Sequence, residues 1–162
     1  MNKFFLFIVS LVMVSCSQHS SEVERLQNRI DSLARKQADT YKPGLGEFMS
    51  GIQMHHAKLW FAGTEGNWPL ADFELGEIRE SIDDIKKYQS DRIEVKTIGM
   101  IDPPLAGIDN AVKQKDIAAF KASFILLTNT CNNCHQANNF GFNVIKVPDA
   151  LPVPNQVFAP SK

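Results

Sequence analysis

The chain has 162 residues, of which 44% are hydrophobic, enough for one folded domain with its own core and additional terminal segments. Its formal net charge of −1 excludes the strongly basic surface that nucleic-acid binding requires. Cys131 and Cys134 lie close together and Cys16 stands alone, which excludes the dispersed, even-numbered cysteines of a disulfide framework. Aliphatic and helix-forming residues dominate the middle of the chain and favour an all-α fold.

Residues 1–15 have the features of a signal peptide. Lys3 supplies a short positive region, and residues 4–14 form an apolar stretch that is too short to span a bilayer. The sequence MVSC at residues 13–16 resembles a lipobox, which implies cleavage before Cys16 and acylation of its thiol. The alternative is an ordinary signal peptide followed by an incidental cysteine. The residues after Cys16 leave open whether the anchor lies in the inner or the outer membrane.

Residues 16–43 are mostly polar and are expected to form a lipid-anchored helical stalk. Apolar residues recur in it at alternating spacings of three and four, the a/d pattern of two heptads. They are Val23, Leu26, Ile30 and Leu33. Two interpretations are open: a solvated spacer that lifts the domain off the membrane, or a weak homo-oligomer contact through residues 20–36. Pro43 and Gly44 then break the helix, and the main domain is expected to span residues 44–162.

Four amphipathic helices are expected in this domain, followed by a proline-rich extended tail. The helices are predicted at residues 45–62, 69–88, 105–113 and 116–136. In the last helix a core stripe steps by three and four residues and continues into the two cysteines. Its members are Ile117, Phe120, Phe124, Leu127, Cys131 and Cys134. Prolines 148, 152, 154 and 160 exclude a helix of any length after residue 138, so this segment must lie extended over the domain.

The sequence CNNCH at residues 131–135 is the arrangement that attaches c-type haem. Cysteines three residues apart on a helix share one face, so Cys131 and Cys134 reach two vinyl groups, and His135 is placed to bind the iron. A redox C-x-x-C would be expected beside a βαβ pattern, which is absent. A zinc site would need further ligands, for which His55 and His56 are the candidates. A disulfide staple would add little to a domain with a core of this size.

The position of this motif resembles that in the cytochrome c′ family, which has its haem motif on the last of four helices. The resemblance covers residues 45–136 and is clearest in the segment DIAAFKASFILLTNTCNNCHQ. It implies an all-α four-helix bundle with up-down-up-down topology, one covalent haem c and a proximal iron ligand at His135. Two segments depart from the family: residues 46–75 and the tail ending in NQVFAP. Both are similar to a subgroup of bacterial lipoprotein cytochromes.

The resemblance also implies that the first helix covers the distal face of the haem. Methionine there makes the iron six-coordinate and suited to electron transfer, whereas an apolar residue leaves it five-coordinate and able to bind small gases. Met49, Gln53 and His56 share one helix face, and Met54 and His55 point elsewhere. Met49 is the expected distal ligand and His56 the alternative. A core methionine that merely fills a gap is the other interpretation of Met49.

Other side chains are expected to surround the haem. Lys58 or Arg79 is a candidate partner for a haem propionate. The aromatic residues Trp60, Phe61 and Trp68 are expected to pack around the haem or at the turn after the first helix.

The sequence therefore predicts a periplasmic, membrane-tethered electron carrier with a single haem. We expect no substrate turnover, transient contacts with periplasmic or membrane redox proteins, and attachment to the membrane through the lipid anchor. The alternative function is a five-coordinate haem protein that binds or senses nitric oxide or carbon monoxide. A metal-free or zinc-bound interaction module is a third class.

Overall fold

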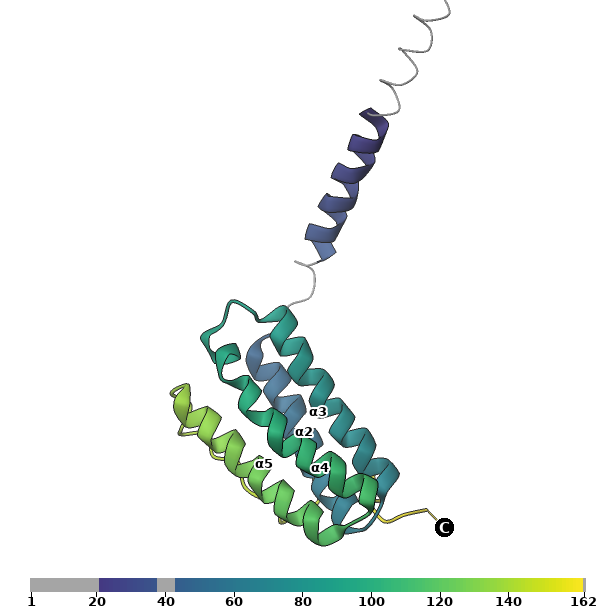
Figure 1. Cartoon of the computed structure of the whole chain (residues 1–162), viewed down its shortest axis with the longest axis vertical. Coiled ribbons are helices and arrows are strands. Elements are labelled where there is room, and N and C mark those ends of the chain that lie inside the picture. Colours follow the sequence, from purple (N-terminus) through teal and green to yellow (C-terminus); the bar gives the residue numbers. More distant parts are fainter. Residues whose placement is uncertain (1–20, 38–42, 162) are drawn as a thin grey trace, which may run out of the picture. The chain divides into compact units, whose positions relative to one another are not determined.

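The all-α class is confirmed by the computed structural model, which describes residues 21–37 and 43–161 and contains no strand among them (Figure 1). The chain divides into two compact units, Met1–Lys42 and Pro43–Lys162. No described helix is both long enough and apolar enough to cross a membrane. The predicted signal peptide and Cys16 lie outside the described residues.

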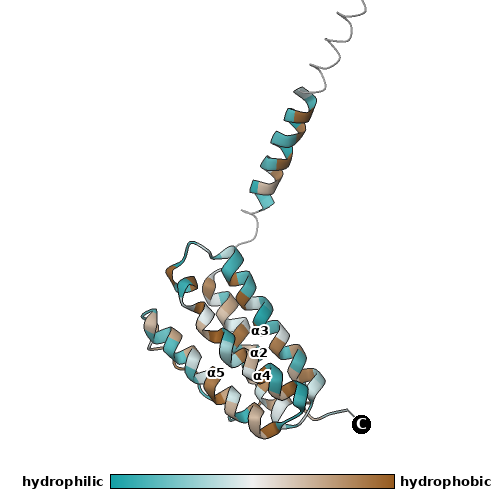
Figure 2. Cartoon of the chain, in the orientation of Figure 1, coloured by the Kyte–Doolittle hydropathy of each residue, from teal (hydrophilic) through white to brown (hydrophobic). Residues whose placement is uncertain are grey.

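In the first unit, residues 21–37 are helical, as the heptad pattern predicts. The apolar stripe of this helix is exposed along its whole length, and Figure 2 shows it as hydrophobic segments among hydrophilic ones. The exposed fractions are 54% for Val23, 47% for Leu26, 57% for Ile30 and 61% for Leu33. An exposed stripe is compatible with both interpretations of the stalk, a solvated spacer and an oligomer contact.

The second unit holds four α-helices and two short 3₁₀ segments. They are α2 (Leu45–Thr64), α3 (Trp68–Tyr88), η1 (Ile93–Lys96), η2 (Ile98–Ile101), α4 (Asp102–Gln114) and α5 (Ile117–Ala137). The predicted helices agree with these bounds except at the start of α4. There Pro103 and Pro104 lie inside the first turn rather than before it, because a proline at that position has no helical hydrogen bond to lose.

Local sequence signals set the ends of these helices. The side chain of Asn67 caps α3 by accepting a hydrogen bond from the Leu70 amide at 3.3 Å. That of Asp116 caps α5, accepting from the amides of Ala118 and Ala119 at 2.9 and 3.0 Å. Side-chain acceptors of this kind satisfy amide groups that the first helical turn leaves without a partner.

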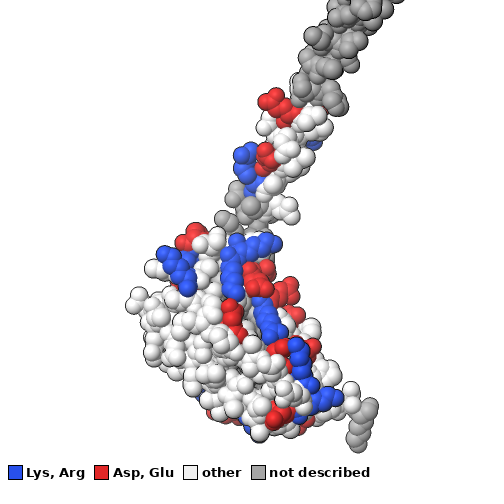
Figure 3. Space-filling model, in the orientation of Figure 1, with Lys and Arg blue, Asp and Glu red and all other residues white. Residues whose placement is uncertain are grey.

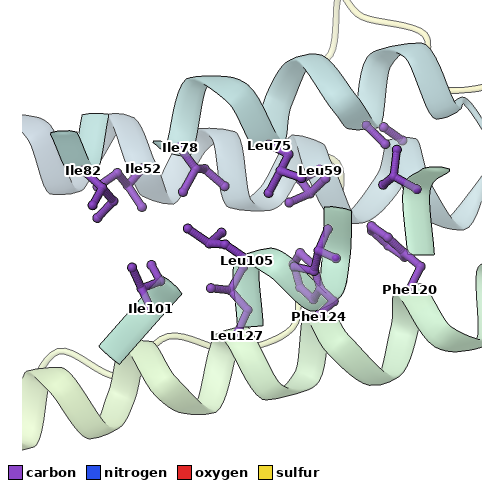
Figure 4. Close-up of a cluster of buried hydrophobic side chains, with 14 of the residues drawn as sticks. Ile52, Leu59, Leu75, Ile78, Ile82, Ile101, Leu105, Phe120, Phe124 and Leu127 are labelled. Carbon is purple, nitrogen blue, oxygen red and sulfur yellow. The ribbon is translucent and has the colours of Figure 1, made fainter. Parts of the chain in front are cut away.

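The core lies between the four helices. Helix α2 packs on α3 and α5, and α4 packs on the same two helices, so each helix has two neighbours. Isoleucine, leucine and phenylalanine side chains from all four helices fill the space between them (Figure 4). At the end of α2, Gly63 faces the Phe120 ring so closely that a Cβ atom would lie 2.2 Å from the ring. Of the predicted stripe on α5, Phe120, Phe124 and Leu127 are buried, the two cysteines are half-buried, and Ile117 at the start of the helix is 40% exposed.

Residues 138–161 contain no helix or strand. In Figure 1 this yellow segment runs back along α5 toward the opposite end of the unit. There Phe158 is buried with its ring centroid 5.7 Å from that of Phe61, and Asn67 Nδ2 donates to the Ala159 carbonyl at 3.3 Å. The segment is therefore held against the helices far from the point where it leaves α5.

Candidate functional site

The candidate site lies at the last two turns of α5, where Cys131, Cys134 and His135 follow one another. Both cysteines carry free thiols and are half-buried. Because they are three residues apart on a regular helix, their sulfur atoms belong to one helix face. This face is directed toward the first turns of α2, since residues of both helices line the same hollows.

The environment of Cys131 keeps its side chain protonated. Burial, with a smaller contribution from nearby Cys134, raises the pKa of the Cys131 thiol to about 11. At neutral pH this group is a neutral thiol and a poor nucleophile, unlike the activated thiolates of disulfide oxidoreductases. A disulfide oxidoreductase needs a cysteine of low pKa, and the raised pKa of Cys131 therefore argues against the redox C-x-x-C interpretation.

Polar groups gather around Cys134 instead. The side-chain amide of Asn138 donates from Nδ2 to the Cys134 carbonyl at 2.8 Å, and the same Nδ2 atom lies 3.5 Å from the Cys134 sulfur. The Thr97 hydroxyl lies 3.6 Å from the same sulfur and accepts from Asn138 at 2.7 Å. These contacts tie the link before α4 to the end of α5 and hold the Cys134 side chain in one orientation.

The ring of His135 is oriented by the backbone of the tail. Its Nδ1 atom lies 2.7 Å from the carbonyl oxygen of Asn143. A carbonyl oxygen can only accept, so Nδ1 carries the hydrogen and Nε2 keeps its lone pair. Histidines that bind metals through Nε2 are oriented by this type of Nδ1 contact to a carbonyl or carboxylate. This orientation leaves the Nε2 lone pair of His135 available to a metal.

Three adjoining hollows surround the motif. The largest, about 440 Å³, is lined by Met49, Arg92, Cys134 and His135 among others, and its size falls in the range of small-molecule sites. A second, of about 140 Å³, is bounded by Met49, His56, Cys131 and His135, and a third, of about 40 Å³, by both cysteines together with Met49 and His135. Met49 and His135 border all three, so their side chains face a shared space.

The two predicted distal ligands, Met49 and His56, differ in burial and in hydrogen bonding. Met49 is half-buried on the wall of this space. His56 is buried, its Nε2 lies 2.9 Å from the hydroxyl of Thr128, and its ring centroid is 4.4 Å from that of Phe124. The Thr128 hydroxyl gives its own hydrogen to the Phe124 carbonyl at 3.0 Å, so it accepts from His56, and Nε2 is the donor. Burial lowers the pKa of His56 to about 4, so the ring is neutral.

The neighbours of these candidates follow the predicted helix face in part. Gln53 borders the 140 Å³ hollow with Met49 and His56, and Met54 is 41% exposed. His55 is not a plain surface residue, because its Nδ1 lies 2.7 Å from a carboxylate oxygen of the buried Glu74. The two histidines proposed as further zinc ligands thus contact different residues: His55 contacts Glu74, and His56 contacts Thr128. No cluster of three or more metal-binding side chains occurs in residues 21–37 and 43–161.

A cation for which the sequence predicts no role, Arg92, lies beside the largest hollow. Arg92, in the link after α3, lines the 440 Å³ hollow, and its Nη2 lies 2.6 Å from Glu94. Of the predicted propionate partners, Lys58 lies 4.0 Å from Glu74 and Arg79 lies 3.3 Å from Asp109. Neither lines the three hollows. An arginine in an irregular link has no periodic signal by which the sequence alone would show it.

The predicted aromatic residues lie near the turn between α2 and α3 and pack on α5 and on the tail. Trp60 lies over Phe124 with ring centroids 4.9 Å apart, and Trp68 meets the edge of Phe120 at 6.3 Å. Phe61 contacts Phe158 of the tail. None of the three lines the hollows around Cys131 and Cys134. Of the two expected locations for these residues, this favours the turn after α2 over the surroundings of the haem.

Comparison of the chain with protein-family models, with curated proteins and with solved structures finds no match.

Proposed function

We propose that this chain is a c-type cytochrome that carries one electron at a time, with haem attached at Cys131 and Cys134 and its iron bound by His135. The observation that carries the proposal is the 2.7 Å contact between His135 Nδ1 and the Asn143 carbonyl. It leaves Nε2 free for iron in the only histidine of the CNNCH motif. Two free thiols and a hollow of 440 Å³ lie beside that ring.

Attachment fits the chemistry of these thiols. Each S–H would add across one vinyl group of haem, so that the sulfur bonds to one vinyl carbon and the hydrogen goes to the other. The addition needs no external oxidant or reductant, and Cys131 and Cys134 carry the free thiols that it consumes. Two such links hold the group without relying on the affinity of the pocket. When bound, haem supplies a one-electron redox centre.

We assign the distal position to Met49. Its side chain borders all three hollows that His135 borders, so both residues could contact a group held in that space. His56 is a weaker candidate, because binding iron through Nε2 would break its contact with Thr128. A thioether is a soft, neutral ligand that favours ferrous iron, which suits electron transfer.

The same proposal includes the arrangement and the place of the protein. We propose that α2, α3, α4 and α5 form a four-helix bundle of the cytochrome c′ kind, with residues 138–161 as an extended tail over it. The chain would be exported, acylated at Cys16 and held on the periplasmic side of a bacterial membrane by the stalk. Such a tether raises its concentration near membrane-bound redox partners.

Contact with those partners is proposed at the face of α5 and the tail. From residue 117 to residue 161 the only lysine, arginine or acidic residues are Lys121, Lys146 and Asp149. Figure 3 shows charged side chains gathered over α3 and α4 and an uncharged face over α5. A surface with few charges desolvates at low cost when a partner docks close to the haem edge.

The test is covalent attachment. Expressed with a c-type maturation system, the wild type should keep its haem through denaturing electrophoresis and acid–acetone extraction. Replacing Cys131 and Cys134 with Ala should abolish this retention, whereas Asn133→Ala, an exposed position between them, should preserve it. Haem that extracts freely from the wild type would contradict the proposal.

A further inference from the structure

The tail is bonded to the haem motif at a second point, through Asn132. The side-chain amide of Asn132 donates from Nδ2 to the Ile145 carbonyl at 2.8 Å, and its Oδ1 accepts from the Ile145 amide at 2.8 Å. Both polar ends of one side chain are thus satisfied by one residue of the tail, as in a pair of strand residues. This pair fixes the distance and the orientation of the tail relative to α5.

The contacts at Asn132 and at His135 join neighbouring positions of α5 to neighbouring residues of the tail. Asn132 and His135 are three residues apart on a helix, so they present neighbouring positions of one face. Asn143 and Ile145 are two residues apart in the tail, and each of their carbonyls accepts a hydrogen bond from a side chain of α5. The Ile145 carbonyl that meets Asn132 and the Asn143 carbonyl that meets His135 therefore face α5 together.

The rest of the tail is anchored on both sides of this contact. Before it, the amide of Phe140 donates to the His135 carbonyl at 2.7 Å, and that of Asn143 to the Phe140 carbonyl at 2.8 Å. Beyond it, Phe158 is buried on Phe61 at the other end of the unit. Asn143 and Ile145 also border the 140 Å³ hollow with Met49 and His135. The tail is thus part of the wall of the site.

We propose that Asn132 is a positioning residue for the iron ligand. By holding Ile145 it keeps the Asn143 carbonyl at the Nδ1 hydrogen of His135. This inference rests on the proposed function, since it assigns a role at the same site. A fixed carbonyl acceptor draws the Nδ1 hydrogen toward itself and makes Nε2 a stronger electron donor, which favours ferric iron. Asn132 thereby keeps the reduction potential lower than a mobile tail would.

The experiment compares Asn132→Ala with Asn133→Ala. The two variants remove the same side chain from adjacent positions of the motif, and Asn133 is exposed. In the haem-loaded protein, Asn132→Ala should make the reduction potential more positive and lower the hydrogen-exchange protection of the Ile145 amide by about tenfold. Asn133→Ala should leave both at the wild-type values. A merely structural side chain would change stability without moving the potential.

A third variant changes the tail and leaves residues 131–135 intact. Ile145→Pro removes the amide hydrogen that Asn132 accepts, so it should also shift the potential to a more positive value. If Asn132→Ala does not mature with haem, the potential of Ile145→Pro tests the positioning role of Asn132 instead. Haem-loaded Asn132→Ala and Ile145→Pro proteins with the wild-type potential would overturn this inference while the proposed function stands. A wild type whose haem is lost in acid–acetone extraction contradicts the proposed function itself, and this is measured before any variant is compared.

Discussion

His56 on α2 and Thr128 on α5 share a 2.9 Å hydrogen bond across the interior of the unit, in which the imidazole donates. Burial keeps His56 neutral beside the Phe124 ring, and the contact gives the hydrogen on its Nε2 atom an acceptor. It also removes His56 Nε2 from the set of groups free to bind iron. The assignment of the distal ligand and the acid stability of the fold both depend on this pair.

Met49→Ala should open the distal side of the iron. We expect the spectrum to change from low-spin to high-spin, the potential to fall, and carbon monoxide to bind rapidly. A weak absorption near the red end of the visible range, typical of a methionine–iron bond, should disappear. Met54→Ala is the matched control, since Met54 lies on the same helix, is 41% exposed and does not border the hollows.

Two results would reassign this position. If Met49→Ala stays low-spin while His56→Ala becomes high-spin, His56 is the ligand and the contact with Thr128 must break in the haem-bound protein. If the wild type is already high-spin, neither residue binds iron, and the protein belongs with the five-coordinate gas-binding alternative. The spectra of the three proteins separate all of these cases.

His56 should make the protein sensitive to acid below pH 6.5. The pKa of His56 is lowered from 6.5 to about 4 in the folded chain, so between these values the unfolded chain takes up a proton that the folded one refuses. Stability from this group is complete above pH 6.5 and is lost as the pH falls toward 4, by about 3 kcal/mol in total. Urea unfolding at pH 7 and pH 4.5 measures the difference.

The control for this prediction is His56→Gln, which keeps an amide donor for Thr128 but does not titrate. Its free energy of unfolding should change less than that of the wild type between pH 7 and pH 4.5. Equal pH dependence in the two proteins would show that other groups cause the acid sensitivity.

Gly63→Ala should be destabilising, because its Cβ would lie 2.2 Å from the Phe120 ring in the contact between α2 and α5. Overpacking of this kind costs about 1–3 kcal/mol, and the buried ring has little room to move. Gly51→Ala on the same helix has nothing within 4 Å of its Cβ and should stabilise by up to about 1 kcal/mol through helix propensity. Thermal unfolding of the two variants should therefore shift in opposite directions, and a shift in the same direction would contradict this close approach.

Lipidation at Cys16 is predicted from the sequence MVSC at residues 13–16. Intact mass of the membrane fraction should show loss of residues 1–15 and the addition of acyl chains. Cys16→Ser should release the protein from the membrane fraction without altering haem attachment at Cys131 and Cys134. A soluble wild type with an unmodified Cys16 thiol would rule out the anchor.

Features that repeat along the chain could be predicted from the sequence by itself. The spacing of apolar residues by three and four locates α2, α3 and α5 within a few residues, because burial of one helix face imposes that period. The CNNCH motif is equally readable, since its cysteines and histidine need only local helix geometry to share a face. The same pattern misplaces the start of α4, where Pro103 and Pro104 suit either a link or a first helical turn.

The contacts that tune the site were decided by the tertiary structure alone. The Asn143 carbonyl that selects the His135 tautomer, and the Ile145 backbone that pairs with Asn132, belong to an irregular segment without periodic pattern. Arg92 reaches the site from a link, and Thr128 meets His56 from 72 residues away in the sequence. Every residue carries the same backbone carbonyl. Which carbonyl meets a given imidazole therefore depends on how the chain packs and not on the local amino-acid sequence.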